Sequence, residues 1–166
     1  MIFNAEQPAG RTRVAAAYRV ALSIALGLTA GIVLYIVVGL MILSSRSAVS
    51  RDELLIPFYG AAAMCALGAL VLRRIQMQGS RLESVAVRRG IAGLLGHLVT
   101  TTIISGALAE VVAVLGLLLS LLTSDLTHVL RLGVVALAVS VYNFPRLRAW
   151  QQAVEYFEQT AGAGAN

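Results

Sequence analysis

One carboxylate, Glu110, lies in the middle of a long apolar stretch, and its type and position could support chemistry. Between Gly90 and Ser124 it is the only residue with a formal charge. An ionised carboxylate at the centre of a bilayer costs about 2.5 kcal/mol or more. We therefore expect the Glu110 carboxyl to be protonated, to be paired, or to face protein or water. Such a group can take up and release a proton, so Glu110 is a candidate ion-binding residue.

Small residues recur beside Glu110 at helical spacing and predict a face on which another helix can come close. They are Gly106, Ala109, Ala113, Gly116 and Ser120. We expect the carboxyl at the margin of this helix contact rather than in lipid. Its possible partners are Tyr35 and Arg131, and the sequence does not choose between them. For Arg131 the alternative is that its side chain extends outward to the membrane interface.

The run from Ser105 to Ser120, SGALAEVVAVLGLLLS, resembles the ion-binding helix of the proteolipid subunit c family of rotary ATP synthases. In that family an Ala-Leu-Ala-Glu-like element is followed by a glycine and then by aliphatic residues. The resemblance implies that Glu110 is the carboxylate that takes up and releases a proton, and that Gly116 is the glycine that follows it. Duplicated proteolipids carry the carboxylate on their last span, whereas here it lies on the third. We interpret the chain as a c-like membrane protein and not as a rotor subunit proper.

The composition places these residues in a membrane protein. Hydrophobic residues make up 58% of the 166 residues and charged residues 13%, and the mean hydropathy is +0.83. A soluble domain of this size cannot bury so much apolar surface. All 13 basic residues are arginines, and they lie beside apolar segments, where they act as topology signals. The pI near 10.1 therefore does not indicate a nucleic-acid partner.

Four apolar segments are long enough to cross a hydrocarbon core, which takes about 20 helical residues. We expect an all-α, integral membrane four-helix bundle with spans at about 20–44, 54–72, 97–123 and 126–144, in one domain over 1–166. The last span is short unless its helix begins near Leu126, because Arg131 and Arg146 lie close together in the sequence. Gly27 and Gly31 form a GxxxG pattern in the first span, typical of helix packing within a chain or between two copies.

The arginines predict the orientation of the bundle. Three precede the first span, five lie in a predicted loop over 73–92 and two follow the last span, whereas the opposite connections carry three. Arginine-rich segments stay in the cytoplasm, so both termini and the loop 73–92 are expected there. The apolar stretch of the first span is too long for a cleaved signal peptide, so we expect an uncleaved helix in a bacterial inner membrane.

After Pro145 the chain predicts an amphipathic helix on the membrane surface, over about 146–160. Its apolar residues share one helical face, and they are Leu147, Trp150, Val154 and Phe157.

The sequence carries no pattern typical of an enzyme. It has no glycine-rich phosphate loop, no paired carboxylates and no serine nucleophile motif. Its single cysteine is Cys65, and His97 and His128 are expected near opposite membrane faces, so we expect no metal and no cofactor. The chain is interpreted as a non-enzymatic protein surrounded by lipid, which forms a homo-oligomer or joins other membrane subunits through its small-residue stripes. The alternative is translocation of a proton or another cation through Glu110.

Overall fold

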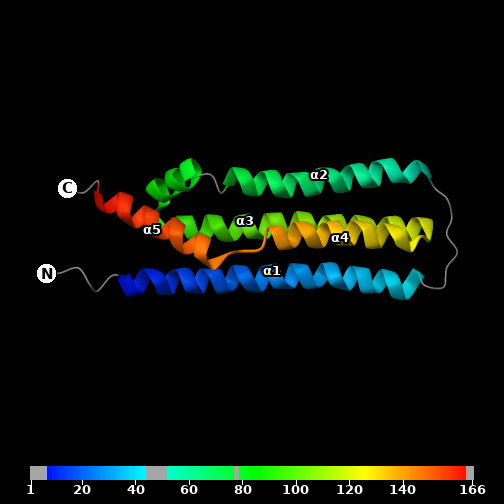
Figure 1. Cartoon of the computed structure of the whole chain (residues 1–166), viewed down its shortest axis with the longest axis horizontal. Helices are drawn as coiled ribbons and strands as arrows, with labels where there is room; N and C mark the ends of the chain where they lie inside the picture. Colours follow the sequence, from blue (N-terminus) through cyan, green and yellow to red (C-terminus); the bar gives the residue numbers. More distant parts are fainter. Residues whose placement is uncertain (1–6, 44–51, 77–78, 164–166) are drawn as a thin grey trace.

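The computed structural model describes residues 7–43, 52–76 and 79–163, and in these ranges the chain is helical apart from short connections. The helices are α1 (Gln7–Leu43), α2 (Asp52–Gln76), α3 (Gly79–Thr123), α4 (Leu126–Tyr142) and α5 (Leu147–Ala163). The first four lie side by side along the long axis, and α5 crosses the end of the bundle at which α1 begins (Figure 1). The predicted all-α class is confirmed for the described ranges.

Four helical segments are long and apolar enough to cross a membrane, as the sequence predicts. They are Thr12–Leu43, Glu53–Gln76, Gly90–Thr123 and Leu126–Tyr156. The last of these begins at Leu126, the start that the arginine spacing requires, and runs past the end of α4 into α5. The chain is therefore compatible with a multi-pass membrane protein. Arg46 and Arg51, two of the arginines behind the predicted orientation, lie outside the described residues, and the cytoplasmic side of the termini stays a prediction.

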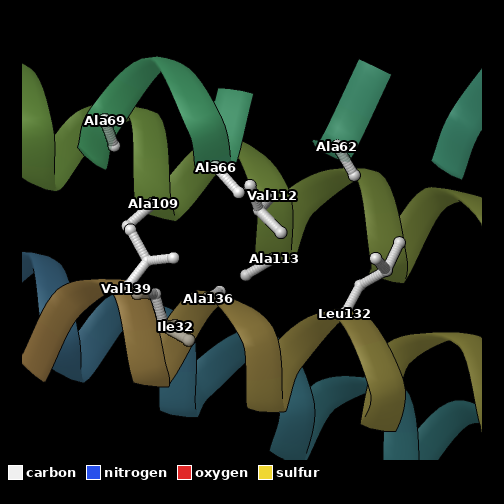
Figure 2. Packing of buried hydrophobic residues seen from close by; sticks show 10 residues of the cluster. All are labelled: Ile32, Ala62, Ala66, Ala69, Ala109, Val112, Ala113, Leu132, Ala136 and Val139. Carbon is white, nitrogen blue, oxygen red and sulfur yellow. The ribbon is translucent and has the colours of Figure 1, made fainter. Parts of the chain in front are cut away.

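The helix α3 is the centre of the bundle. It contacts α1, α2 and α4, whereas α1 and α2 lie on opposite sides of the α3–α4 pair (Figure 1). Figure 2 shows the core where these helices meet, and most of its side chains are small. Its buried members are Ile32, Ala62, Ala66, Ala69, Ala109, Val112, Ala113, Leu132, Ala136 and Val139. Lipid is as apolar as a protein core, so helices in a bilayer associate by close contact between small residues.

The helix α5 lies against the bundle through two apolar residues of its predicted face. Trp150 and Val154 are buried against α1 and α3, and the Trp150 ring meets Tyr18 edge to face with centroids 5.9 Å apart. The Tyr18 hydroxyl donates to the Pro145 carbonyl at 3.5 Å. Leu147 is exposed, and the Phe157 side chain lies outside the described residues. The amphipathic helix is therefore confirmed, but part of its apolar face covers protein and not lipid.

The segment 73–92, predicted as a loop between two spans, is helical in most of its described part, and the candidate spans on its two sides end at Gln76 and begin at Gly90. α2 continues to Gln76, helical structure resumes at Gly79, and a break at Gly90 turns the chain into the long part of α3. Gly90 has φ 64° and ψ −171°, a region that is essentially restricted to glycine. The sequence interpretation failed because arginines end an apolar run without ending a helix, since Arg is a good helix former.

Replacing Gly90 by alanine should destabilise the protein by about 1–3 kcal/mol, because the backbone conformation at this position strains any residue with a Cβ. The control is Gly96→Ala in the same helix, where the added methyl group meets nothing within 4 Å. The control should be neutral or stabilising by up to about 1 kcal/mol, the helix propensity of alanine over glycine. Thermal unfolding in detergent, followed by circular dichroism, measures both. A Gly90→Ala protein that melts together with the control would contradict the strained turn.

Candidate functional site

Glu110 lies on α3 towards α1, and a residue of α1 holds its carboxyl. The Tyr35 hydroxyl donates a hydrogen bond to Glu110 Oε1 over 3.0 Å. Both side chains are half-buried. Of the two partners that the sequence allows, the structure thus brings Tyr35 to the carboxyl. The hydrogen bond joins two spans, because its residues are 75 positions apart in the chain.

Gly31 provides the space for this contact. It lies one helical turn before Tyr35 on α1, so both residues face α3. A Cβ at position 31 would lie 2.9 Å from Glu110 Oε1, closer than such atoms approach in proteins. The second glycine of the predicted GxxxG pattern therefore has a specific role. It lets the carboxyl oxygen lie directly against the α1 backbone.

Gly27, the first glycine of that pattern, has a different environment. It is exposed, and a Cβ there would meet nothing within 4 Å. The expectation that Gly27 packs against another helix of the same chain is therefore wrong. The glycine that continues the α1 contact is Gly39, which is buried and where a Cβ would meet Val129 of α4 at 3.0 Å. The spacing of Gly31, Tyr35 and Gly39, at four-residue intervals, is the signal that identifies this face.

Arg131 is not at the carboxyl. Its side chain is exposed on α4, and its charge acts on Asp125, the residue that caps that helix. Among the described residues no ion pair joins Arg131 to Glu110. This placement agrees with the alternative in which Arg131 extends outward.

The small-residue stripe beside Glu110 lies inside the bundle. Ala109 and Ala113 belong to the core, and Ser120 is fully buried. A Cβ at Gly106 would meet Leu28 of α1 at 2.6 Å, and one at Gly116 would meet the Leu132 Cβ of α4 at 2.8 Å. The stripe is therefore used for contacts within one chain. These contacts account for the stripe within one chain, and the expectation that an oligomer forms stays a prediction.

A second polar contact, which the sequence did not indicate, joins α2 and α4 at the end of the bundle where α3 meets α4. The Tyr59 hydroxyl lies 3.0 Å from His128 Nδ1, and His128 Nε2 lies 3.6 Å from Asp125 Oδ2. Asp125 accepts a hydrogen bond from the Thr127 backbone N–H at 2.8 Å. Hydrogen bonds from Thr127, together with the charge of Arg131, hold the pKa of Asp125 below its usual value. The signal for this contact was present as Asp125 and His128 three residues apart at a helix start.

Gly31→Ala should destabilise the α1–α3 contact, because the new methyl group would force the Glu110 carboxyl away from Tyr35. The methyl group meets the far end of a flexible side chain, so the expected loss relative to the control is about 0.5–1.5 kcal/mol, the contribution of the hydrogen bond that it breaks. The matched control is Gly60→Ala on α2, where a Cβ meets nothing within 4 Å. Thermal unfolding in detergent measures both proteins. Equal stability of the two variants would contradict the close approach at Gly31.

The resemblance of residues 105–120 to subunit c rests on this sequence alone. In the structure Gly116, the residue that matches the glycine of that family, contacts α4, while Glu110 faces α1. No known family model matches the sequence, and no curated protein or solved structure is significantly similar to it.

Proposed function

We propose that this chain is a non-enzymatic, multi-pass membrane protein that acts by assembling, either with a second copy or with other membrane subunits. The observation that carries the proposal is an exposed face of α1 that lies beside the Glu110 contact, about a quarter of a turn around the helix. Ser23, Gly27 and Ala30 are all exposed there, with Leu34 next in the same row. Their spacing of four, three and four residues puts them on one side of the helix.

This α1 face has the composition that favours association between membrane helices. Small residues let two backbones approach closely, and three of the four positions are Ser, Gly or Ala. Ser23 donates its hydroxyl proton to the Arg19 carbonyl of its own helix at 2.8 Å, so its polar group is satisfied. Among the described residues no atom lies within 4 Å of a Cβ at Gly27, so a partner helix is the contact that would use its missing side chain.

In this proposal Glu110 has a structural role, in which its carboxyl connects α1 to α3. Its carboxyl accepts the Tyr35 hydrogen bond, and a neutral carboxyl is far cheaper to place among helices than an ionised one. α1 must be held in a fixed rotation for its outer face to be presented to a partner. The Tyr35–Glu110 hydrogen bond contributes to that rotation because both groups are on facing sides of their helices.

Proton or cation translocation through Glu110 is the second candidate. It is favoured by the half-buried state of the carboxyl, which leaves part of the side chain accessible from outside the bundle. Against it, Glu110 is the only acid in the sequence of the four expected spans. Translocation paths generally use several protonatable groups.

Glu110→Gln separates the two candidates. The amide oxygen can still accept from Tyr35, so a structural role predicts an unchanged fold, thermal midpoint and assembly mass. Glu110→Ala removes the acceptor and should cost about 1–3 kcal/mol in stability. Native mass spectrometry in mild detergent gives the mass, and a pH-sensitive dye inside reconstituted vesicles reports proton flux. If the wild-type protein carries a proton flux and Glu110→Gln does not, translocation and not a structural role is the function of Glu110.

Gly27→Leu tests the assembly face. A leucine on this face should hold two copies apart and shift the mass distribution from a multiple of the 17.5 kDa chain towards one chain. Gly60→Leu is the control, since Gly60 is an exposed glycine of α2 with an equally open environment. The proposal is wrong if the wild-type protein is a single chain at every concentration tested and co-purifies with no other subunit. Equal loss of assembly in both variants would also reject this face.

A further inference from the structure

A cavity of about 340 Å³ lies at the corner where α4 ends and α5 begins. α2, α3 and the corner itself contribute its walls, and Trp150 of α5 closes one side. The chain turns at this corner through Asn143, Phe144 and Pro145. The same end of the bundle holds the start of α1 and the end of α2 (Figure 1). The cavity is thus at the level where two candidate spans end.

Two arginines face this cavity and are not neutralised there. Arg73, in the last turn of α2, and Arg146, at the corner, both line it, and the described lining residues include no Asp or Glu. The charges of the two guanidinium groups repel each other. Arg73 is also held in place, because it donates to the Phe144 carbonyl at 3.4 Å and lies over the Tyr142 ring at 5.5 Å. Arg146 is exposed, so solvent screens part of this repulsion, and an anion that accepts from both guanidinium groups would remove the rest.

The other walls have the mixed character of a headgroup site. Thr101 and Asn143 supply polar groups, whereas Leu98 and Trp150 are apolar. Asn143 is only 6% exposed, and no described residue donates a hydrogen bond to its Oδ1. Because Oδ1 is an acceptor, a donor such as a water or a hydroxyl group of the headgroup would satisfy it, and a phosphate oxygen would not. The volume lies at the lower end of the range for small-molecule sites.

We propose that this cavity binds the phosphate group of an anionic phospholipid between Arg73 and Arg146. The phosphate oxygens would accept charge-assisted hydrogen bonds from both guanidinium groups. The lipid's glycerol part would lie at the open side of the cavity, beside Ala149. Basic pockets between membrane helices hold anionic headgroups in this way. The site is separate from Glu110 and from the assembly face of α1, so it goes beyond the function proposed above and depends only on the chain crossing a membrane.

Native mass spectrometry of the delipidated full chain tests this site, with short-chain phosphatidylglycerol, phosphatidylcholine and inorganic phosphate as probes. Phosphatidylglycerol should bind at one molecule per chain and more tightly than phosphatidylcholine. Arg73→Gln and Arg146→Gln should each weaken its binding about tenfold, the effect of losing one hydrogen bond to a charged group. The controls are Arg74→Gln and Arg148→Gln. These residues are exposed neighbours that do not line the cavity, so their variants should bind like the wild type.

Three outcomes would overturn the proposal. The first is equal binding by the cavity variants and the control variants, which would indicate a nonspecific basic surface. The second is equal binding of phosphatidylcholine. The third is complete displacement of the lipid by inorganic phosphate at the same concentration, which would identify a free anion as the ligand. Arg146→Gln decides the test by itself if Arg73→Gln fails to fold, because Arg146 is exposed and its loss removes no described hydrogen bond of the side chain.

Discussion

The bundle depends on close approach between helices at positions that lack a side chain. The side chain of Leu28 on α1 packs against Gly106, and that of Leu132 on α4 packs against Gly116. The side chain of Ile36 on α1 packs against Gly133 of α4. At each of these positions a Cβ would come within 2.8 Å of its neighbour. In a bilayer such contacts replace the hydrophobic effect as the source of helix association. They explain why α3, which carries two of the three glycines and several alanines, can be surrounded by the other spans.

Close approach also brings polar groups within hydrogen-bond distance of each other, and in hydrocarbon they have no other partner. The Thr29 and Ser140 hydroxyls lie 2.8 Å apart between α1 and α4, and the Val129 N–H donates to Ser120 Oγ at 2.7 Å. The Tyr35–Glu110 hydrogen bond belongs to the same set. It differs from the others because its acceptor can carry a charge. The Glu110 site is thus one of several contacts in which polar groups of two spans pair, and it is the one whose acceptor is a carboxyl group.

The sequence predicted the elements of the fold well where a single physical signal decides them. Apolar length predicted four segments that can cross a membrane, and the arginine spacing located the start of α4 at Leu126. The helical structure before Gly90 was not predicted, because the arginines in this segment were taken to end the helix. A single glycine conformation, which no composition reveals, makes that turn.

The candidate site was predictable only in part, for a reason of geometry. The midpoint of an apolar run identifies Glu110 without any structure, and the choice of Tyr35 over Arg131 as its partner needed the rotation of α1 and α4 about their axes. The same rotation decides which glycines pack within the chain. Gly27 and Gly31 are one turn apart, but the first is exposed and the second touches the carboxyl. A four-residue step advances an α-helix by slightly more than one turn, so the edge of a contact can fall between two such residues.

The arginine cavity and the docking of α5 are parts of one arrangement. Trp150 lines the cavity and is also the residue by which α5 contacts Tyr18 of α1. The Tyr18 hydroxyl in turn donates to the Pro145 carbonyl at the corner. A ligand that binds only the docked arrangement stabilises it by mass action. If the lipid proposal holds, an anion between Arg73 and Arg146 would therefore favour the arrangement in which α5 lies on the bundle.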